Sequence, residues 1–274
     1  MPHQKLRQIY VAMVEARLLD EHIKGLKGAK RPRATRGEEA CRVSTAIDLG
    51  SGDAVSDSHA GVGMELLAGA KVTSLLGRVV QAKDKGRTKA DGGGDSKHGP
   101  WVMPWTEDAG ERLKLAMGTA LVFRKIGAAK VVAAYVAHAD ARKGEWRGIL
   151  KLASKLELPI FFVVLPDGRR GKKKDFGRVA KRAGSCGVPG MVVDANDAVA
   201  LYRVAQETLG RARGGGGPVL IECVSVPQES ERGEAEADPL DQMRNFLRGR
   251  KIATDTWLEQ AAASFHRKLA GRKS

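Results

Sequence analysis

The segment VVAAYVAHADARKGEWRGILKLASKLELPIFFVVLPDGRRG, residues 131–171, predicts two parallel β-strands joined by a helix. Residues 131–137 and 159–165 are almost entirely apolar, which is typical of parallel strands covered on both faces. Residues 144–156, between them, have the length and apolar spacing of a helix. Ligands of such sheets bind beyond the carboxyl ends of the strands. We therefore expect the two turns that follow these strands to lie side by side at a ligand site.

The remaining segments extend this pattern into an α/β fold, an open and mostly parallel sheet flanked by helices. Residues 4–24 place apolar side chains at three- and four-residue spacing and predict a helix. The helix at 111–123 consists largely of small and apolar residues, so we expect it to be buried. Further helices are expected at 37–49, 59–67, 175–183, 197–213 and 255–269, and further strands at 53–55, 191–193 and 219–226.

Residues 1–274 are expected to form a single domain, in which 229–274 are a linker and a helical tail. Pro239 is expected at the start of a tail helix, where proline is tolerated. Asp194 or Asn196 is available to cap the helix that follows them. We expect a long loop at 84–106, a flexible glycine link at 214–217 and an acidic loop at 229–238.

The composition is that of a soluble globular protein, with 42% hydrophobic residues. No apolar run reaches membrane-spanning length, and the N-terminus lacks the pattern of a signal peptide. The three cysteines, Cys41, Cys186 and Cys223, are odd in number and far apart, which favours a reducing compartment over a disulfide framework. We therefore expect a cytoplasmic protein.

The formal net charge of +15 favours an anionic ligand or partner. Basic residues cluster at 24–42 and at 169–182. Aromatic residues make up only 5% of the chain and are not interleaved with the basic ones, so stacking on nucleic-acid bases is not expected. A solvated basic surface remains the alternative interpretation of this charge.

Several motifs, in the same order along the chain, resemble the α subunit of the thiamine-diphosphate-dependent 2-oxo acid dehydrogenases, the E1 component. Residues 187–226, GVPGMVVDANDAVALYRVAQETLGRARGGGGPVLIECVSV, are the most similar stretch. The other motifs are IYVAMVEARLLDE at 9–21, RGEEA at 36–40, AGERLKLAMGTAL at 109–121, LPIFFVV at 158–164 and DPLDQMRNFL at 238–247. The resemblance implies a thiamine-diphosphate-binding fold, magnesium, oxidative decarboxylation of a 2-oxo acid with acyl transfer to lipoamide, and an E1β subunit that completes the site.

The cofactor motifs of this family are altered in the chain. The family holds magnesium diphosphate with a Gly-Asp-Gly turn, which falls on Ala137, His138 and Ala139, and with an Asn-Asn pair, which falls on Pro166 and Asp167. Magnesium prefers hard oxygen ligands, whereas imidazole suits softer metals. A Tyr-Arg pair that reaches the diphosphate in the family corresponds to His59 and Ala60. No catalytic residue is assigned.

The candidate cofactor-binding residues are His59, Gly110, His138, Asp140, Asp167, Arg169 and Arg170, of which Asp140 and Asp167 could also bind a metal ion. His138 either ligates a metal or an anion or caps a turn, and we favour the cap. Asp167 is either a metal ligand or the acceptor of an Asp-Gly turn, and we favour the turn. The cluster that begins with Arg169 and Arg170 either clamps an anion or is a solvated loop.

Three hypotheses follow, in order of preference. The first is a degenerate, non-catalytic E1α-like protein that keeps the fold and self-associates or pairs with an E1β-like chain. The second is an active α subunit with a rearranged site built on Asp140, Asp167, Arg169 and Arg170. The third is a binding module whose basic surface docks an anionic partner.

Overall fold

The computed structural model describes residues 1–26, 36–59, 62–81, 99–167, 176–226, 228–230, 233–235 and 238–271. Its α-helices are α1 (His3–Gly25), α2 (Glu39–Ala46), α3 (Gly63–Leu67), α4 (Val72–Gln81), α5 (Ala109–Lys125), α6 (Gly144–Lys155), α7 (Arg178–Gly184), α8 (Ala198–Arg213), α9 (Pro239–Gly249) and α10 (Asp255–Leu269). Its strands are β1 (Ala54–Ser56), β2 (Trp101–Val102), β3 (Val132–Val136), β4 (Ile160–Val164), β5 (Gly190–Asp194), β6 (Val219–Val224), β7 (Gln228–Ser230) and β8 (Gly233–Ala235). Within these ranges, no helix combines the length and the apolar character needed to cross a membrane.

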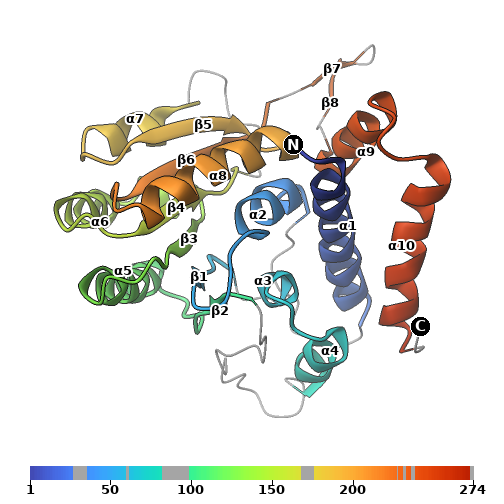
Figure 1. Ribbon diagram of the computed structural model, residues 1–274, viewed down its shortest axis with the longest axis horizontal. Coiled ribbons are helices and arrows are strands. Elements are labelled where there is room, and N and C mark those ends of the chain that lie inside the picture. Colours follow the sequence, from blue (N-terminus) through green and yellow to red (C-terminus); the bar gives the residue numbers. More distant parts are fainter. Residues whose placement is uncertain are drawn as a thin grey trace.

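The main sheet has six strands in the order β2-β1-β3-β4-β6-β5, and every neighbouring pair is parallel (Figure 1). The two strands predicted from 131–171 are the central neighbours β3 and β4, and α6 joins them. All residues of β3 and β4 are buried, because helices cover both faces of the sheet. The expected α/β fold is therefore confirmed.

Successive residues of β3 and β4 belong to two separate cores. One core contains Tyr135 and Phe161 and is completed by α1, α2, α8 and the C-terminal helices. The other contains Val136 and Phe162 and is completed by α5, α6 and α7. In this second core Trp146 of α6 meets the edge of Phe162, with ring centroids 5.1 Å apart. The alternation follows from the two-residue period of a strand.

The C-terminal helices pack on the first helix of the chain (Figure 1). Tyr10 of α1 contacts Trp257 of α10, with ring centroids 6.1 Å apart. Arg17 of α1 bonds to Glu39 of α2 at 2.6 Å and to Asp238, the N-cap of α9, at 2.7 Å. Burial raises the pKa of Asp238, but the hydrogen bond from Arg17 outweighs it and leaves this pKa below its usual value. Ion pairing therefore ties the helical tail to the N-terminal half of the chain.

Some expected loops contain regular structure. Trp101–Val102 forms strand β2 within the segment expected as a long loop, most of which lies outside the described residues. Strands β7 and β8 pair as an antiparallel hairpin in the segment expected as an acidic loop. Helix α4 was not anticipated, and α3 begins at Gly63, four residues later than expected. The two-residue strand was missed because its pairing with β1 depends on a partner distant in sequence.

Two further expectations are corrected by local geometry. The cap of α8 is Asp197 itself, which accepts hydrogen bonds from the Val199 and Ala200 amides at 3.0 and 2.9 Å. Helix α5 is buried on one side only, since Leu115 and Val122 are 42% and 55% exposed. The glycine link after α8 turns back through left-handed residues and hydrogen bonds to the end of that helix.

Glu222 of β6 is a fully buried acid that caps a neighbouring helix. Its carboxylate accepts hydrogen bonds from the Ala180 amide at 2.6 Å and the Gly177 amide at 3.2 Å, at the start of α7. No acidic residue lies in the first turn of α7 itself. The charge of Glu222 therefore stabilises the unpaired amides of this helix from the adjacent strand.

We expect Glu222→Ala to lower the free energy of unfolding by about 3 kcal/mol, because two buried amides lose a charged acceptor. Glu222→Gln should cost less, since its amide oxygen still accepts one bond. Urea unfolding monitored by circular dichroism measures both values. Glu207→Ala, on the exposed face of α8, is the control and should change stability by less than about 0.5 kcal/mol. Equal losses in Glu222→Ala and the control would contradict the capping role.

Candidate functional site

The carboxyl ends of β3 and β4 lie side by side, as predicted. Val136 pairs with Val164, and the Leu165 amide donates to the Val136 carbonyl at 2.9 Å. The chain after β3 turns at once, because the amides of Asp140 and Ala141 both donate to the Ala137 carbonyl. This edge of the sheet brings together His138, Asp140 and Asp167 from two segments about thirty residues apart.

His138 and Asp167 face each other across the two strand ends. His138 Nδ1 lies 3.7 Å from Asp167 Oδ2, which is within ion-pair range but too long for a hydrogen bond. Among the described residues this buried nitrogen has no hydrogen-bond partner, so it does not cap the turn after β3. The Asp167 side chain is 45% exposed. The pair offers one imidazole and one carboxylate to any ligand.

Asp140 is already engaged by two cations. It opens a short 3-10 turn, η1 (Asp140–Arg142), and its Oδ1 accepts a hydrogen bond from Lys143 Nζ at 2.7 Å. Its Oδ2 lies 3.8 Å from Arg112 Nη2. The hydrogen bond to Asp140 raises the pKa of Lys143, whereas burial lowers the pKa of Arg112. The negative charge of Asp140 is therefore balanced within the protein.

Arg112 of α5 is held in place by the segment before that helix. It donates to the backbone carbonyls of Thr106 and Glu107, and its guanidinium lies 5.5 Å from the ring centre of Trp105. The side chain is 7% exposed. With its donors directed at these carbonyls, Arg112 is a fixed cation beside Asp140.

Gly110, a second candidate, is enclosed by carboxylates. A β-carbon at this position would lie 2.8 Å from Glu145 Oε2 and 3.0 Å from Asp108 Oδ1. Asp108 caps α5 by accepting from the Glu111 amide at 2.8 Å. The missing side chain at Gly110 thus leaves room for two acids, and their charges oppose an incoming diphosphate.

These residues do not fit a magnesium-bound diphosphate. In the described part of the chain, no group of three or more His, Cys, Asp or Glu side chains is placed to hold a metal ion. By the resemblance, the position of the family's acid falls on His138, and Asp140 forms an ion pair with Lys143. Magnesium requires several oxygen ligands in octahedral geometry, and the described side chains at this edge of the sheet do not provide such a set.

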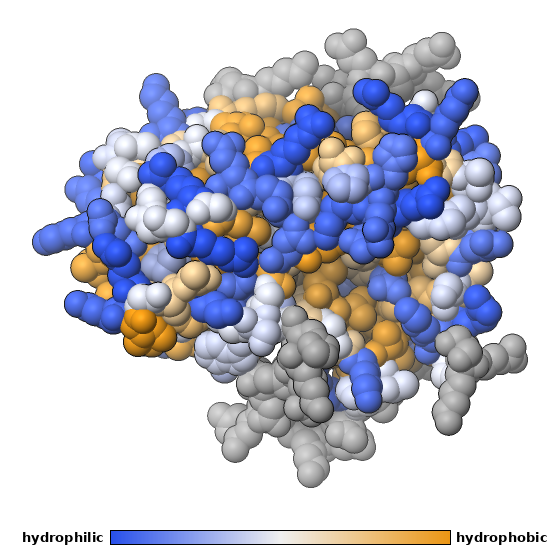
Figure 2. Space-filling model, in the orientation of Figure 1, coloured by the Kyte–Doolittle hydropathy of each residue, from blue (hydrophilic) through white to orange (hydrophobic). Residues whose placement is uncertain are grey.

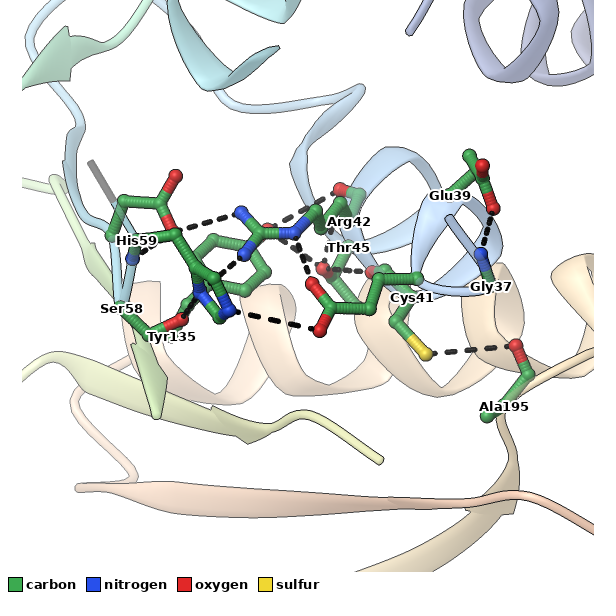
Figure 3. Close-up of polar contacts among 11 residues, drawn as sticks. Gly37, Glu39, Cys41, Arg42, Thr45, Ser58, His59, Tyr135 and Ala195 are labelled. Atoms are coloured by element: carbon green, nitrogen blue, oxygen red, sulfur yellow. Dashed lines mark hydrogen bonds and ion pairs between the residues drawn. The ribbon is translucent and has the colours of Figure 1, made fainter. Parts of the chain in front are cut away.

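A buried charge network lies behind these strand ends, around Arg42 of α2 (Figure 3). Arg42 Nε donates to Glu38 at 2.9 Å, Nη1 donates to Asp57 at 2.8 Å, and Nη2 lies 3.0 Å from His59 Nδ1. The guanidinium also stacks over the Tyr135 ring at 5.6 Å. Burial lowers the pKa of Arg42, but the charges of Asp57 and Glu38 outweigh it and raise this pKa above its usual value. The network joins α2, the end of β1 and β3.

His59 belongs to this network. It is 5% exposed, and its Nδ1 lies 2.5 Å from Ser58 Oγ as well as near Arg42. Because an arginine can only donate, Nδ1 is the acceptor and the neutral ring carries its proton on Nε2, which faces Glu38 at 3.9 Å. His59 is thus bound to a structural cation, where the family has a side chain that reaches the diphosphate.

Sequence reasoning did not identify Arg42, Glu38 or Asp57. The four-residue spacing of Glu38 and Arg42 on a helix could have suggested their ion pair. Nothing in the sequence indicated that both side chains are buried. The predicted Arg169 and Arg170, together with the Gly-rich stretch 91–98, lie outside the described residues.

Comparison with known proteins gives consistent matches. A model of the family described as "Dehydrogenase E1 component" matches residues 10–229. The acetoin:2,6-dichlorophenolindophenol oxidoreductase subunits alpha of Bacillus subtilis and Cupriavidus necator are each 30% identical over 199 residues, covering 69% of this chain and 59% of theirs. The 3-methyl-2-oxobutanoate dehydrogenase subunit alpha of Mycobacterium tuberculosis is 26% identical, covering 96% of this chain and 76% of its own. The chain thus spans about three fifths of the length of the first two relatives.

We expect Arg42→Met to lower the free energy of unfolding by about 3–5 kcal/mol, because it leaves Glu38 and Asp57 buried without their cation. The variant that combines Arg42→Met with Glu38→Gln and Asp57→Asn should recover part of this loss, since it removes the unpaired charges. Urea unfolding measures all three proteins. Arg147→Met, on the exposed surface of α6, is the control. If Arg42→Met lowers the free energy of unfolding no more than this control does, the network has no structural role.

Proposed function

The chain belongs to the dehydrogenase E1 component family, and from this premise we propose that it is an E1α-like subunit without cofactor chemistry of its own. In this proposal the fold and the subunit contacts of the family are kept, while magnesium and thiamine diphosphate are not bound in the family's way. The resemblance motifs on which the fold depends are intact, whereas the changes fall on the strand ends.

One observation carries the proposal, namely the pairing of Asp140 with Lys143 and Arg112. Asp140, two residues further on, is the nearest carboxylate along the sequence that could replace the acid lost at His138. A metal ion at this carboxylate would have to displace a hydrogen bond of 2.7 Å from an ammonium group and lie close to a buried guanidinium. The local charge therefore favours an empty metal site.

The proposed partner is an E1β-like chain. The curated relatives are named as alpha subunits. Helix α5 exposes Leu115, Val122 and Ile126 on its outer side, where they are 42%, 55% and 68% exposed. In Figure 2 hydrophobic residues reach the surface at the end of the molecule where α5 lies. We assign this outer face of α5 to the contact with the partner chain.

We expect no saturable binding when the chain, mixed with an E1β-type chain, is titrated with thiamine diphosphate and magnesium in a calorimeter. A mixture with an E1β-type chain should also fail to reduce 2,6-dichlorophenolindophenol with pyruvate or 3-methyl-2-oxobutanoate. Stoichiometric binding of the cofactor to the wild-type chain would overturn the proposal and favour an active subunit with a rearranged site.

The variant His138→Asp with Asp167→Asn is the matched control, because it restores the two family ligands. We expect no gain in affinity, since Glu145 and Asp108 still enclose Gly110. A gain in this variant alone would show that the loss is confined to the two ligands and that the rest of the pocket is intact.

Native mass spectrometry of the chain purified from its host tests the partner. We expect an assembly with an E1β-like chain that carries no thiamine diphosphate. Val122→Glu and Ile126→Glu should dissociate it, because each places a charge in the apolar contact, whereas Val192→Glu on the edge strand β5 should not. An assembly that survives both α5 variants would exclude this face as the interface.

A further inference from the structure

A cavity of about 580 Å³ lies between the first helix of the chain, the start of α8 and the C-terminal helix α9. It is formed by the N-terminal end of α1, the first turn of α8 and helix α9. In Figure 1 the N-terminus lies beside α9, near the end of the sheet that carries β5 and β6. The cavity shares no lining residue with His59, Gly110, His138, Asp140 or Asp167. It is therefore a separate site on the edge-strand side of the sheet.

The walls of the cavity carry more positive than negative charge. Arg203 of α8, Arg250 after α9 and His3 of α1 line it, and none of the three forms an ion pair within the described part of the chain. The acidic side chain in the lining is Asp197, whose carboxylate is bonded to two amides of α8. Because Asp197 already caps the helix, the attraction for an anion comes from the two guanidinium groups.

A polar group in the wall lacks a partner. Gln242 Oε1 is a buried atom that accepts no hydrogen bond from any described residue. A buried polar atom without a partner is unfavourable by about 1–3 kcal/mol, so a ligand gains this energy if the Gln242 side chain turns its amide toward the cavity and bonds to it. An amide in this position presents an oxygen to a donor or, turned over, an NH2 group to an acceptor. The site thus requires a ligand with a hydroxyl or amide group as well as a charge.

An apolar surface separates the charged and polar groups. Phe246 of α9 lines the cavity beneath Arg250, whose guanidinium lies 5.8 Å from the ring centre. Leu6 and Ile252 extend this wall, and Arg7 fixes it by donating to the Ile252 carbonyl at 2.9 Å. The volume is within the range of small-molecule sites, which combine apolar walls with a few polar groups.

We propose that this cavity binds a small organic anion, a phosphate monoester or a carboxylate, that also carries a hydroxyl group. Arg203 and Arg250 hold the anionic end, the Gln242 amide bonds to the hydroxyl, and Phe246 and Leu6 contact the carbon skeleton. The site is independent of the proposed loss of cofactor chemistry, since none of its residues belongs to the strand ends of β3 and β4.

Calorimetric titration of the full chain at constant ionic strength tests the proposal with three probes. Glycerol 3-phosphate and 3-hydroxybutyrate each combine an anion with a hydroxyl, and inorganic phosphate lacks the carbon skeleton. We expect saturable binding of at least one organic probe, at least about tenfold tighter than inorganic phosphate. Stronger binding of glycerol 3-phosphate would identify a phosphate monoester as the ligand class, and stronger binding of 3-hydroxybutyrate a carboxylate.

Variants assign the binding to this cavity. Arg203→Gln and Arg250→Gln should each weaken it by about tenfold or more, because a charged hydrogen bond is lost. Gln242→Leu should weaken it without lowering the thermal stability, since the unpaired amide is removed. Arg147→Gln, an exposed arginine on α6, and Asp140→Asn should leave the affinity unchanged.

Three results would overturn the proposal. They are the absence of saturable binding for both organic probes, affinities that are unchanged in Arg203→Gln and Arg250→Gln, and equal affinity for inorganic phosphate and the organic probes. The last result would identify an adventitious ion only. Arg203 is exposed and makes no ion pair in the described part of the chain, so we expect Arg203→Gln to fold and its affinity to report on binding alone.

Discussion

The parallel pairing of β3 with β4 is the constraint on which the other parts of this protein depend. Their residues are buried on both faces, and the one polar group along them, the Tyr135 hydroxyl, is hydrogen-bonded to Thr45 and to the Arg42 carbonyl. Polar groups accumulate instead where the two strands end, at His138, Asp140 and Asp167. The same pairing separates two cores, one under α5, α6 and α7 and the other under α1, α2 and α8. Even Glu222, the one acid inside a central strand of the described sheet, is compensated by the amides of α7.

Two of the carboxylates near the strand ends form ion pairs with cations of the protein itself. Asp140 is paired with Lys143, and Asp57 is paired with Arg42. A site that binds magnesium diphosphate needs free carboxylate oxygens on one side and free cations on the other. In this chain Asp140 and Asp57 of that region are paired with cations of the protein, whereas Asp167 is 45% exposed. The fold of the family is thus present, and the proposed loss of its cofactor chemistry rests on these ion pairs.

The cavity beside α9 shows the opposite arrangement. Its arginines lack acidic partners in the described residues, and the Gln242 oxygen lacks a donor. The tail helices create this cavity because the ion pairs of Arg17 hold α9 against α1 and α2. The C-terminal tail was expected only as a linker and a helical tail. Its helix α9 also forms one wall of this cavity.

The sequence by itself determined the α/β class, the order of the central elements and the juxtaposition of the turns after β3 and β4. These follow from local patterns, namely apolar runs, helical spacing, and the prolines Pro159 and Pro239, which mark the start of a strand and of a helix. By the resemblance it also placed the family's cofactor turn at Ala137, His138 and Ala139. Only the tertiary structure decided which charges meet. Arg42 and Asp57, or Arg112 and Asp140, are separated along the chain, and their pairing depends on how α2 and α5 pack on the sheet. The short strand β2 and the cavity at α9 were decided in the same way, because each needs partners from distant segments.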